Sequence, residues 1–124
     1  MLHHISLPVG DLPAATRLYT AALRPLGGRL VYQDDRFSGF GITEDEDILG
    51  LRRADPAIAA GPGFHLAFAA PSRAAVDAFH AAALANGASD NGPPGLRAAY
   101  GPDYYAAFVI DLDGHRIEAV FKGP

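Results

Sequence analysis

The apolar residues of the first half change from a strand-like to a helix-like spacing and back again. Residues 3–9 alternate well enough between apolar and polar side chains to predict a strand. Asp11 is a favourable N-cap residue, and Pro13 falls in the first turn of the helix that follows. The apolar residues of this helix recur three or four positions apart: Leu12, Ala15, Leu18, Tyr19, Ala22, Leu23 and Leu26. After Gly27-Gly28, three short strands are predicted over residues 29–33, 37–42 and 47–52.

The second half repeats this order of elements. A strand over residues 64–70 precedes a helix that Ser72 caps and Asn86-Gly87 ends. Residues 88–103 hold so many prolines and glycines that we expect a loop there, wrapped around a binding site. The last elements form a hairpin, because Asp-Gly between apolar runs is a strong turn signal: strands over residues 104–110 and 115–121, joined at Asp111-Leu-Asp-Gly114.

The two halves form a tandem repeat. His4 and His65 open them, and these histidines are separated by the same 61 positions as the helix caps Asp11 and Ser72. Each half reads βαβββ, so we do not expect either to bury its sheet alone. We predict one domain over residues 1–124 with three parts: module 1 at about residues 1–54, a linker at about 55–63 and module 2 at about 64–124.

Composition narrows the classes of function. A chain of 124 residues with 49% hydrophobic content can bury a core. The net charge of −4 argues against nucleic acid or an anionic membrane as a partner. No cysteine is present, which excludes disulfides and thiolate chemistry. No apolar run approaches the length of a membrane span, and the start lacks a signal-peptide pattern, so we expect a cytoplasmic protein.

Three residues carry the candidate chemistry. His4 and His65 stand at the head of equivalent strands, and Glu118 is a lone carboxylate between apolar residues of the last strand. A single histidine on a strand is usually structural, but a carboxylate in an apolar strand is costly unless it is paired or binds a cation. Together the three predict a divalent-metal site with open coordination positions. Of the other histidines, His80 and His115 are expected to face solvent.

Three segments resemble the vicinal oxygen chelate superfamily, which includes glyoxalase I, extradiol dioxygenases, fosfomycin-resistance enzymes and bleomycin-resistance proteins. They are His4-Ile-Ser-Leu-Pro-Val-Gly-Asp-Leu, Phe64-His-Leu-Ala-Phe-Ala and Tyr105-Ala-Ala-Phe-Val-Ile-Asp-Leu-Asp-Gly-His-Arg-Ile-Glu-Ala-Val. The resemblance implies an α+β fold of tandem βαβββ modules, whose strands form a U-shaped, half-open mixed sheet around a metal. It makes His4, His65 and Glu118 the ligands of Fe, Mn, Zn or Ni. It also implies a homodimer, in which His4 of one chain would join His65 and Glu118 of the other.

One position departs from glyoxalase I, which has a fourth ligand on the last strand of its first module. Aligning the two terminal hairpins sets Glu118 against Leu49, which cannot bind a metal. We therefore expect a three-ligand site and no classical glyoxalase I activity.

The candidate substrate-binding residues are Arg97, Tyr100, Tyr104, Tyr105 and, as an apolar wall, Phe40. Two functions fit the sequence. The favoured function is that of a metal-dependent enzyme, either a lyase or a dioxygenase-like enzyme, that acts on a small oxygen-chelating substrate. Glu118 is the only evident catalytic base. The alternative is a metal-free small-molecule binding protein of the bleomycin-resistance type.

Overall fold

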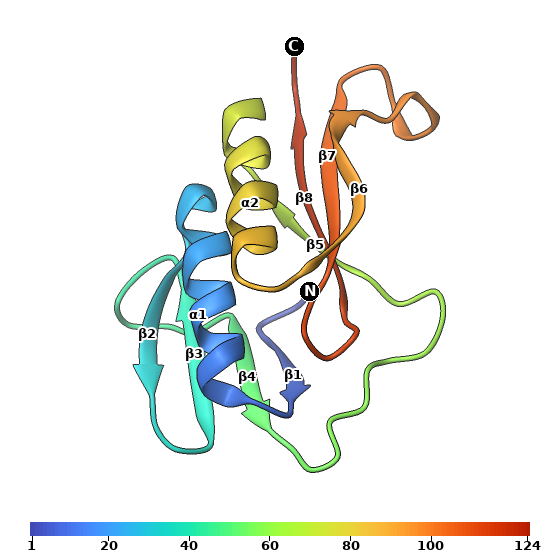
Figure 1. Cartoon of the computed structure of the whole chain (residues 1–124). Helices are drawn as coiled ribbons and strands as arrows, with labels where there is room; N and C mark the ends of the chain where they lie inside the picture. The colour runs from blue at the N-terminus through green and yellow to red at the C-terminus, as the bar shows by residue number, and fades with distance from the viewer.

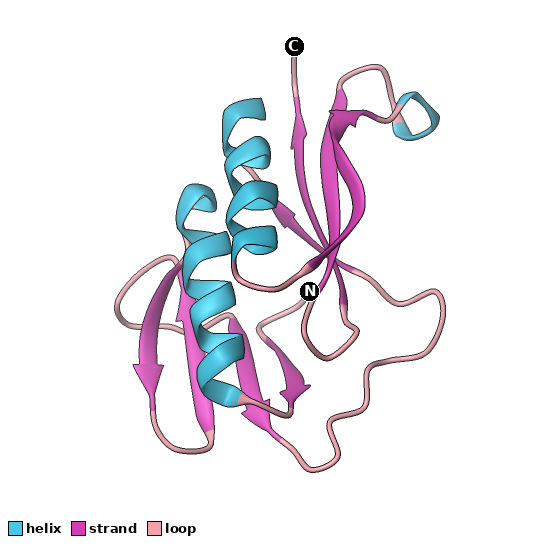
Figure 2. Ribbon diagram, in the orientation of Figure 1, coloured by secondary structure: helices cyan, strands magenta, loops and turns pink.

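The computed structural model describes residues 1–124 and contains two βαβββ modules (Figures 1 and 2). The elements of module 1 are β1 (Ile5–Val9), α1 (Leu12–Leu23), the short 3-10 helix η1 (Arg24–Leu26), β2 (Arg29–Gln33), β3 (Phe37–Gly41) and β4 (Leu49–Arg53). Those of module 2 are β5 (Leu66–Ala69), α2 (Arg73–Ala85), β6 (Ser89–Leu96), the 3-10 helix η2 (Ala98–Tyr100), β7 (Tyr104–Ile110) and β8 (Arg116–Lys122).

Each module builds one open, four-stranded mixed sheet. The strand orders are β1-β4-β3-β2 and β5-β8-β7-β6, so the two modules have the same topology. In both, the first strand pairs in parallel with the last, and the remaining pairs are antiparallel. The α+β class and the tandem modules expected from the sequence are therefore confirmed.

The helices begin where the sequence predicts. The side chain of Asp11 accepts a hydrogen bond from Ala14 N, and Ser72 does the same for Ala75 N. The turn after α1 ends at Gly27, whose φ of 87° suits a residue without a side chain. Neither helix is long and apolar enough to cross a membrane.

One hydrophobic core joins the modules. Each helix covers one face of its own sheet, and the two helices pack against each other (Figure 1). The core combines Leu18 and Phe40 of module 1 with Phe79 and Ile117 of module 2. The opposite face of each sheet does not contribute to this core, and we call it the concave face. The modules are thus joined through their helices, and their concave faces remain available for other contacts.

The turn between β7 and β8 docks onto module 1. Tyr19 donates a 2.6 Å hydrogen bond to Asp111, whose other oxygen accepts from the backbone N–H groups of Asp113 and His115. In addition, Gly10 N donates to the side chain of Asp113 at 2.9 Å. This buried polar contact fixes the last hairpin relative to the end of β1.

The prediction of a loop over residues 88–103 was wrong for its first part, whereas residues 97–103 contain no strand. Residues 89–96 form β6, although its pairing with β7 shifts register on both sides of Gly92. β6 is the edge strand of its sheet, so one side of its backbone needs no partner strand. An edge strand can hold Pro93 and Pro94, which lack an N–H group. Residues 54–65, which include the expected linker, contain no helix or strand.

His80 and His115 were both expected to face solvent, and neither of them does. His115 is only 1% exposed, and its Nε2 lies 2.7 Å from the carbonyl oxygen of Pro8 because the hairpin turn packs against β1. The side chain of His80 is 12% exposed, with Nε2 2.9 Å from Asp90 Oδ1 on β6.

Candidate metal centre

Strand periodicity places Glu118 on the concave face of module 2. Ile117 and Ala119 belong to the core beneath α2, so Glu118 points to the other side of β8. β5 lies beside β8 in parallel, with Ala67 opposite Glu118. His65, two residues before Ala67, lies on the same face. The two side chains therefore meet although 53 positions separate them in the sequence.

The pair has the geometry of two adjacent donors. His65 Nε2 lies 3.3 Å from Glu118 Oε1, and the hydroxyl of Tyr104 on β7 donates a hydrogen bond to Oε2. The Glu118 side chain is 1% exposed, whereas that of His65 is 55% exposed. Glu118 is thus a buried carboxylate with only two side-chain partners, and one of these is an imidazole that reaches toward solvent.

A cavity of about 420 Å³ opens above the pair. Its lining residues are Gly63, Phe64, His65, Asn91, Tyr100, Tyr104, Phe108, Arg116, Ile117 and Glu118. Burial raises the pKa of Tyr104 to about 12, and the hydrogen bond to Glu118 and the charge of Glu118 add to the effect. The phenol therefore stays protonated near neutral pH and acts as a donor toward the carboxylate.

His4 does not reach this pair within one chain. It is exposed ahead of β1, with its Nδ1 2.9 Å from Nδ1 of His3. No three His, Cys, Asp or Glu side chains of the chain lie close enough together to hold a metal ion. The structure thus brings together two of the three predicted ligands, and His4 remains on the concave side of module 1, at the same strand position that His65 has in module 2.

The other candidate residues divide between the two faces of the sheets. Tyr100 and Tyr104 line the cavity. Tyr105 points to the helix side of β7, where its hydroxyl donates to Asp77 of α2 at 2.6 Å. Phe40, expected as an apolar wall, is 1% exposed in the core next to Tyr19. Tyr105 and Phe40 do not line this cavity, because alternate residues of a strand point to opposite faces.

Six lining residues were missed from the sequence: Gly63, Phe64, Asn91, Phe108, Arg116 and Ile117. Phe108 and Arg116 share the strand parity of Tyr104 and Glu118, so the alternation of β7 and β8 could have identified them. Asn91 lies in β6 where the pairing is irregular, and no pattern in the sequence marks it.

The position equivalent to Glu118 in module 1 is Gly50 and not Leu49. Ala67 pairs with Glu118, and Ser6, at the corresponding position of β1, pairs with Gly50. The hairpin alignment was wrong by one residue because 11 positions separate Gly39 from its partner Gly50, whereas 10 separate Phe108 from its partner Glu118. The absence of a fourth ligand still holds: a Cβ atom at Gly50 would lie 2.6 Å from the ring of Phe37.

The donor set of module 2 suits a divalent cation but is incomplete in one chain. An imidazole nitrogen and a carboxylate oxygen are ligands that Fe(II), Mn(II), Zn(II) and Ni(II) accept. Of the acidic residues only Glu118 lines the cavity. His65 and Glu118 would hold the metal, and further ligands must come from outside this chain's cavity.

Comparison with known proteins identifies the family. The model of the glyoxalase/bleomycin resistance protein/dioxygenase superfamily matches residues 1–119. A glyoxalase/bleomycin resistance protein from Albidiferax ferrireducens is 31% identical, with a TM-score of 0.85 and 99% of each chain covered. No curated protein sequence matches the chain significantly.

Two further solved structures share the fold at lower identity. A glyoxalase-related enzyme from Fulvimarina pelagi is 20% identical, with a TM-score of 0.76 and coverage of 98% of this chain and 88% of that chain. The fosfomycin resistance protein FosX from Mesorhizobium loti is 22% identical, with a TM-score of 0.70 and coverage of 99% and 92%. With the full-length family match and the 31% identical structure, these findings show that the chain belongs to the glyoxalase/bleomycin resistance protein/dioxygenase superfamily.

Proposed function

We propose that the protein is a divalent-metal-dependent vicinal-oxygen-chelate enzyme that acts on a small oxygen-chelating substrate. It would be a lyase or a dioxygenase-like enzyme. The observation that carries this proposal is the pairing of His65 with the buried carboxylate of Glu118 at the base of a cavity. A carboxylate at this depth is costly unless a cation or several donors compensate it. His65 and one phenol supply only part of that compensation, and a metal ion would supply the rest.

The third ligand in this proposal is His4 of a second subunit. The concave face of each sheet is left open because the modules are joined through their helices. A homodimer in which module 1 of one chain faces module 2 of the other would bring His4 to His65 and Glu118. The exposure of both histidines supports this assembly, since neither imidazole is buried within its own chain. Such a dimer would contain two equivalent sites, as its two-fold symmetry requires.

The residues of the cavity have distinct tasks in this site. A bound metal would act as a Lewis acid toward a chelating oxygen substrate. Tyr104 donates to Glu118 Oε2, and this contact orients the other oxygen toward His65. Phe64 and Phe108 line the cavity and would exclude water from a bound substrate, and Glu118 is the cavity's one carboxylate able to accept a substrate proton.

Metal binding is the primary test. Calorimetric titration of the chelator-treated protein with Fe(II), Mn(II), Zn(II) and Ni(II) should show about one metal per chain. His65→Ala and Glu118→Ala should weaken this binding at least tenfold, as should His4→Ala. His3→Ala is the matched control for His4, because His3 is adjacent and exposed, and it should bind like the unmodified protein. An absence of binding for all four metals would reject the enzyme and favour a metal-free binding protein.

The shared site has a separate test. His4→Ala and Glu118→Ala chains are mixed under conditions in which subunit exchange is demonstrated. A heterodimer would then hold one intact site and one site that lacks both residues. The mixture should recover metal binding that neither parent shows. No recovery despite exchange would reject the assembly across two subunits.

A metal-free binding protein is the second candidate. The aromatic lining by Phe64, Tyr100, Tyr104 and Phe108 favours it, because such a cavity can hold an apolar or aromatic molecule without a metal. Classical glyoxalase I activity is not expected in either case, since Gly50 supplies no fourth ligand. Negligible turnover of the hemithioacetal of glutathione and methylglyoxal, with added Zn(II) or Ni(II), would agree with this expectation.

A further inference from the structure

Arg97 lies on the concave face beside the cavity of module 2. Its backbone N–H donates to the carbonyl oxygen of Tyr104 at 2.8 Å, so the two residues are direct neighbours across β6 and β7. Neighbours of this kind point to the same face of a sheet. The guanidinium carbon of Arg97 lies 5.4 Å from the ring centre of Phe108, which lines the cavity. The guanidinium of Arg97 therefore lies beside a ring of the cavity wall, although Arg97 is not itself a lining residue.

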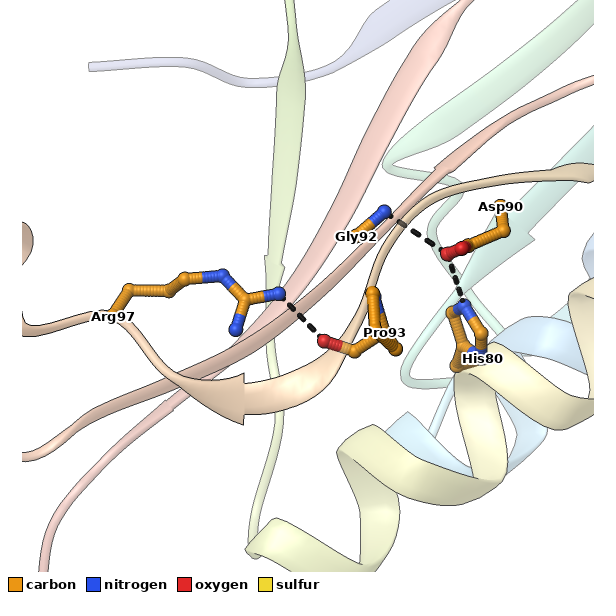
Figure 3. Close-up of polar contacts among 5 residues, drawn as sticks. All are labelled: His80, Asp90, Gly92, Pro93 and Arg97. Carbon is orange, nitrogen blue, oxygen red and sulfur yellow. Dashed lines mark hydrogen bonds and ion pairs between the residues drawn. The ribbon is translucent and has the colours of Figure 1, made fainter.

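The glycines of β6 form a seat for this guanidinium group. A Cβ atom at Gly92 would lie 3.2 Å from Nη2 of Arg97, and one at Gly95 would lie 3.1 Å from Nη1. Nη2 also donates a 2.6 Å hydrogen bond to the carbonyl oxygen of Pro93 (Figure 3). Any side chain at these two glycines would press on the guanidinium, so their bare backbone leaves room for it beside the phenyl ring of Phe108.

Most donors of Arg97 have no acceptor in the chain. A guanidinium has five N–H donors, and the bond to Pro93 uses one of them. No carboxylate forms an ion pair with Arg97. Asp90, the nearby acid, is already bonded through Oδ1 to Gly92 N and to His80. A second cationic side chain, Arg116, lines the same cavity. Two arginines thus lie in or beside the cavity, and neither forms an ion pair within the chain.

A contact from α2 fixes the segment that seats Arg97. His80 Nε2 donates to Asp90 Oδ1 at 2.9 Å, and the same oxygen accepts from Gly92 N at 3.0 Å. These two bonds lower the pKa of Asp90, the bond from Gly92 most. Figure 3 shows His80 and Arg97 approaching the same stretch of β6 from its two ends. We call the contact among His80, Asp90 and Gly92 the β6 clamp.

We infer that the substrate carries an anionic group, a carboxylate or a phosphonate-like oxyanion, that Arg97 binds while the substrate's oxygens occupy the metal site. The β6 clamp positions Arg97 for this contact. The inference rests on the proposed function for the chelating end of the substrate, but the anion contact itself requires no metal. A planar guanidinium with free donors matches the paired oxygens of such groups.

Anion binding is tested first on the metal-free protein, with acetate, methylphosphonate and sulfate as probes followed by NMR. At least one probe should bind and shift the amide signals of residues 92–97. Arg97→Gln should weaken that binding at least tenfold, and Arg97→Lys should weaken it less. Arg36→Gln removes an exposed arginine of module 1 and is the matched control, with unchanged affinity expected. Equal affinity in Arg97→Gln and the unmodified protein would overturn the inference and leave an adventitious ion only.

The substrate class is tested on the metal-loaded protein with two chelators. Phosphonoacetate carries an anionic group that acetohydroxamate lacks, so the protein should prefer phosphonoacetate. Arg97→Gln should reduce this preference at least tenfold while its affinity for the metal stays unchanged. A preference that Arg97→Gln leaves intact would overturn the inference. Failure of metal loading would instead contradict the proposed function, and the anion titration would still decide the role of Arg97.

The positioning role of the clamp has its own readout. His80→Ala should weaken binding of the same anion about threefold, because the seat of Arg97 loses its anchor. His80→Gln keeps a donor for Asp90 and should restore affinity to within about twofold of the unmodified protein. A purely structural role would lower stability in both variants without this difference in anion affinity. Unmodified affinity in a folded His80→Ala protein would reject the clamp.

Discussion

The two modules share one topology but present different concave faces. In module 2, the position of β8 that pairs with Ala67 of β5 holds Glu118, with Tyr104 and His65 in contact. In module 1, the equivalent position is Gly50, and the ring of Phe37 fills the space that a side chain would take. One face is a cavity with a buried acid, and the other is closed by an aromatic ring.

This difference between the concave faces shows which parts of each module are constrained by packing. Both modules must bury the helix side of their sheets, because the shared core depends on it. The concave faces carry no such constraint, so one can hold polar side chains while the other is filled. The hairpins have diverged as well. The β3–β4 connection folds back onto its own sheet at Gly41, whereas the β7–β8 turn docks onto module 1.

The largest effect is expected at Gly41. A Cβ atom there would collide with the backbone oxygen of Glu46, which cannot move without displacing the connection. Gly41→Ala should lower the free energy of unfolding by about 3 kcal/mol, measured by urea denaturation. Gly61→Ala is the control, since no atom lies within 4 Å of its Cβ position, and it should stay within about 0.5 kcal/mol. Similar losses in both variants would show that the connection does not pack on β3.

The second effect concerns the docked hairpin of module 2. Asp111→Ala would leave the buried hydroxyl of Tyr19 and two backbone N–H groups without their acceptor. We expect a loss of about 2 kcal/mol in the free energy of unfolding. Glu118→Gln is the matched comparison, because Glu118 is also buried but accepts from few donors, and it should lose less than about 0.5 kcal/mol without metal. Equal losses would make Glu118 a structural carboxylate like Asp111.

The third effect concerns a variant in which the concave face of module 1 also carries a carboxylate. Phe37→Ala removes the ring over Gly50, and Gly50→Glu then adds a carboxylate at the position equivalent to Glu118. In a dimer with shared sites, this oxygen faces the proposed metal, so the double variant should bind metal about tenfold more tightly, or about 1.4 kcal/mol. Phe37→Ala alone is the control. Unchanged affinity in a folded dimer would argue against modules that face each other.

The smallest effect is the titration of Tyr104. Its pKa of about 12 in the folded protein exceeds the ordinary value of 10.0, with burial as the first cause and Glu118 as the second. The protonated phenol therefore contributes stability that is fully present below pH 10 and is lost as the pH rises toward 12. In Glu118→Gln the pKa should fall but stay above 10, which NMR of ring-labelled tyrosine can measure. An unchanged pKa in this variant would leave burial as the sole cause.

Much of the scaffold could be predicted from the sequence because its signals are local. Asp11 and Ser72 mark the starts of their helices, because each side chain accepts a hydrogen bond from the backbone N–H group three positions later. Strand alternation, with Ile117 and Ala119 on the core side, already set Glu118 on the other face. The repeated spacing of 61 positions fixed which strands correspond, and so brought His65 to the same sheet as Glu118.

What only the tertiary structure decided depends on contacts distant in sequence. Pairing with β7 makes a strand of the proline-rich β6, and its place at the sheet edge allows this. Docking of the last hairpin buries His115 against Pro8. One additional residue between the paired positions Gly39 and Gly50 moves the equivalent of Glu118 from Leu49 to Gly50. The separation of His4 from His65 and Glu118 follows from the packing of helix on helix, which turns the concave faces of the modules away from the core. No local pattern encodes this arrangement, because it results from the shared core of both modules.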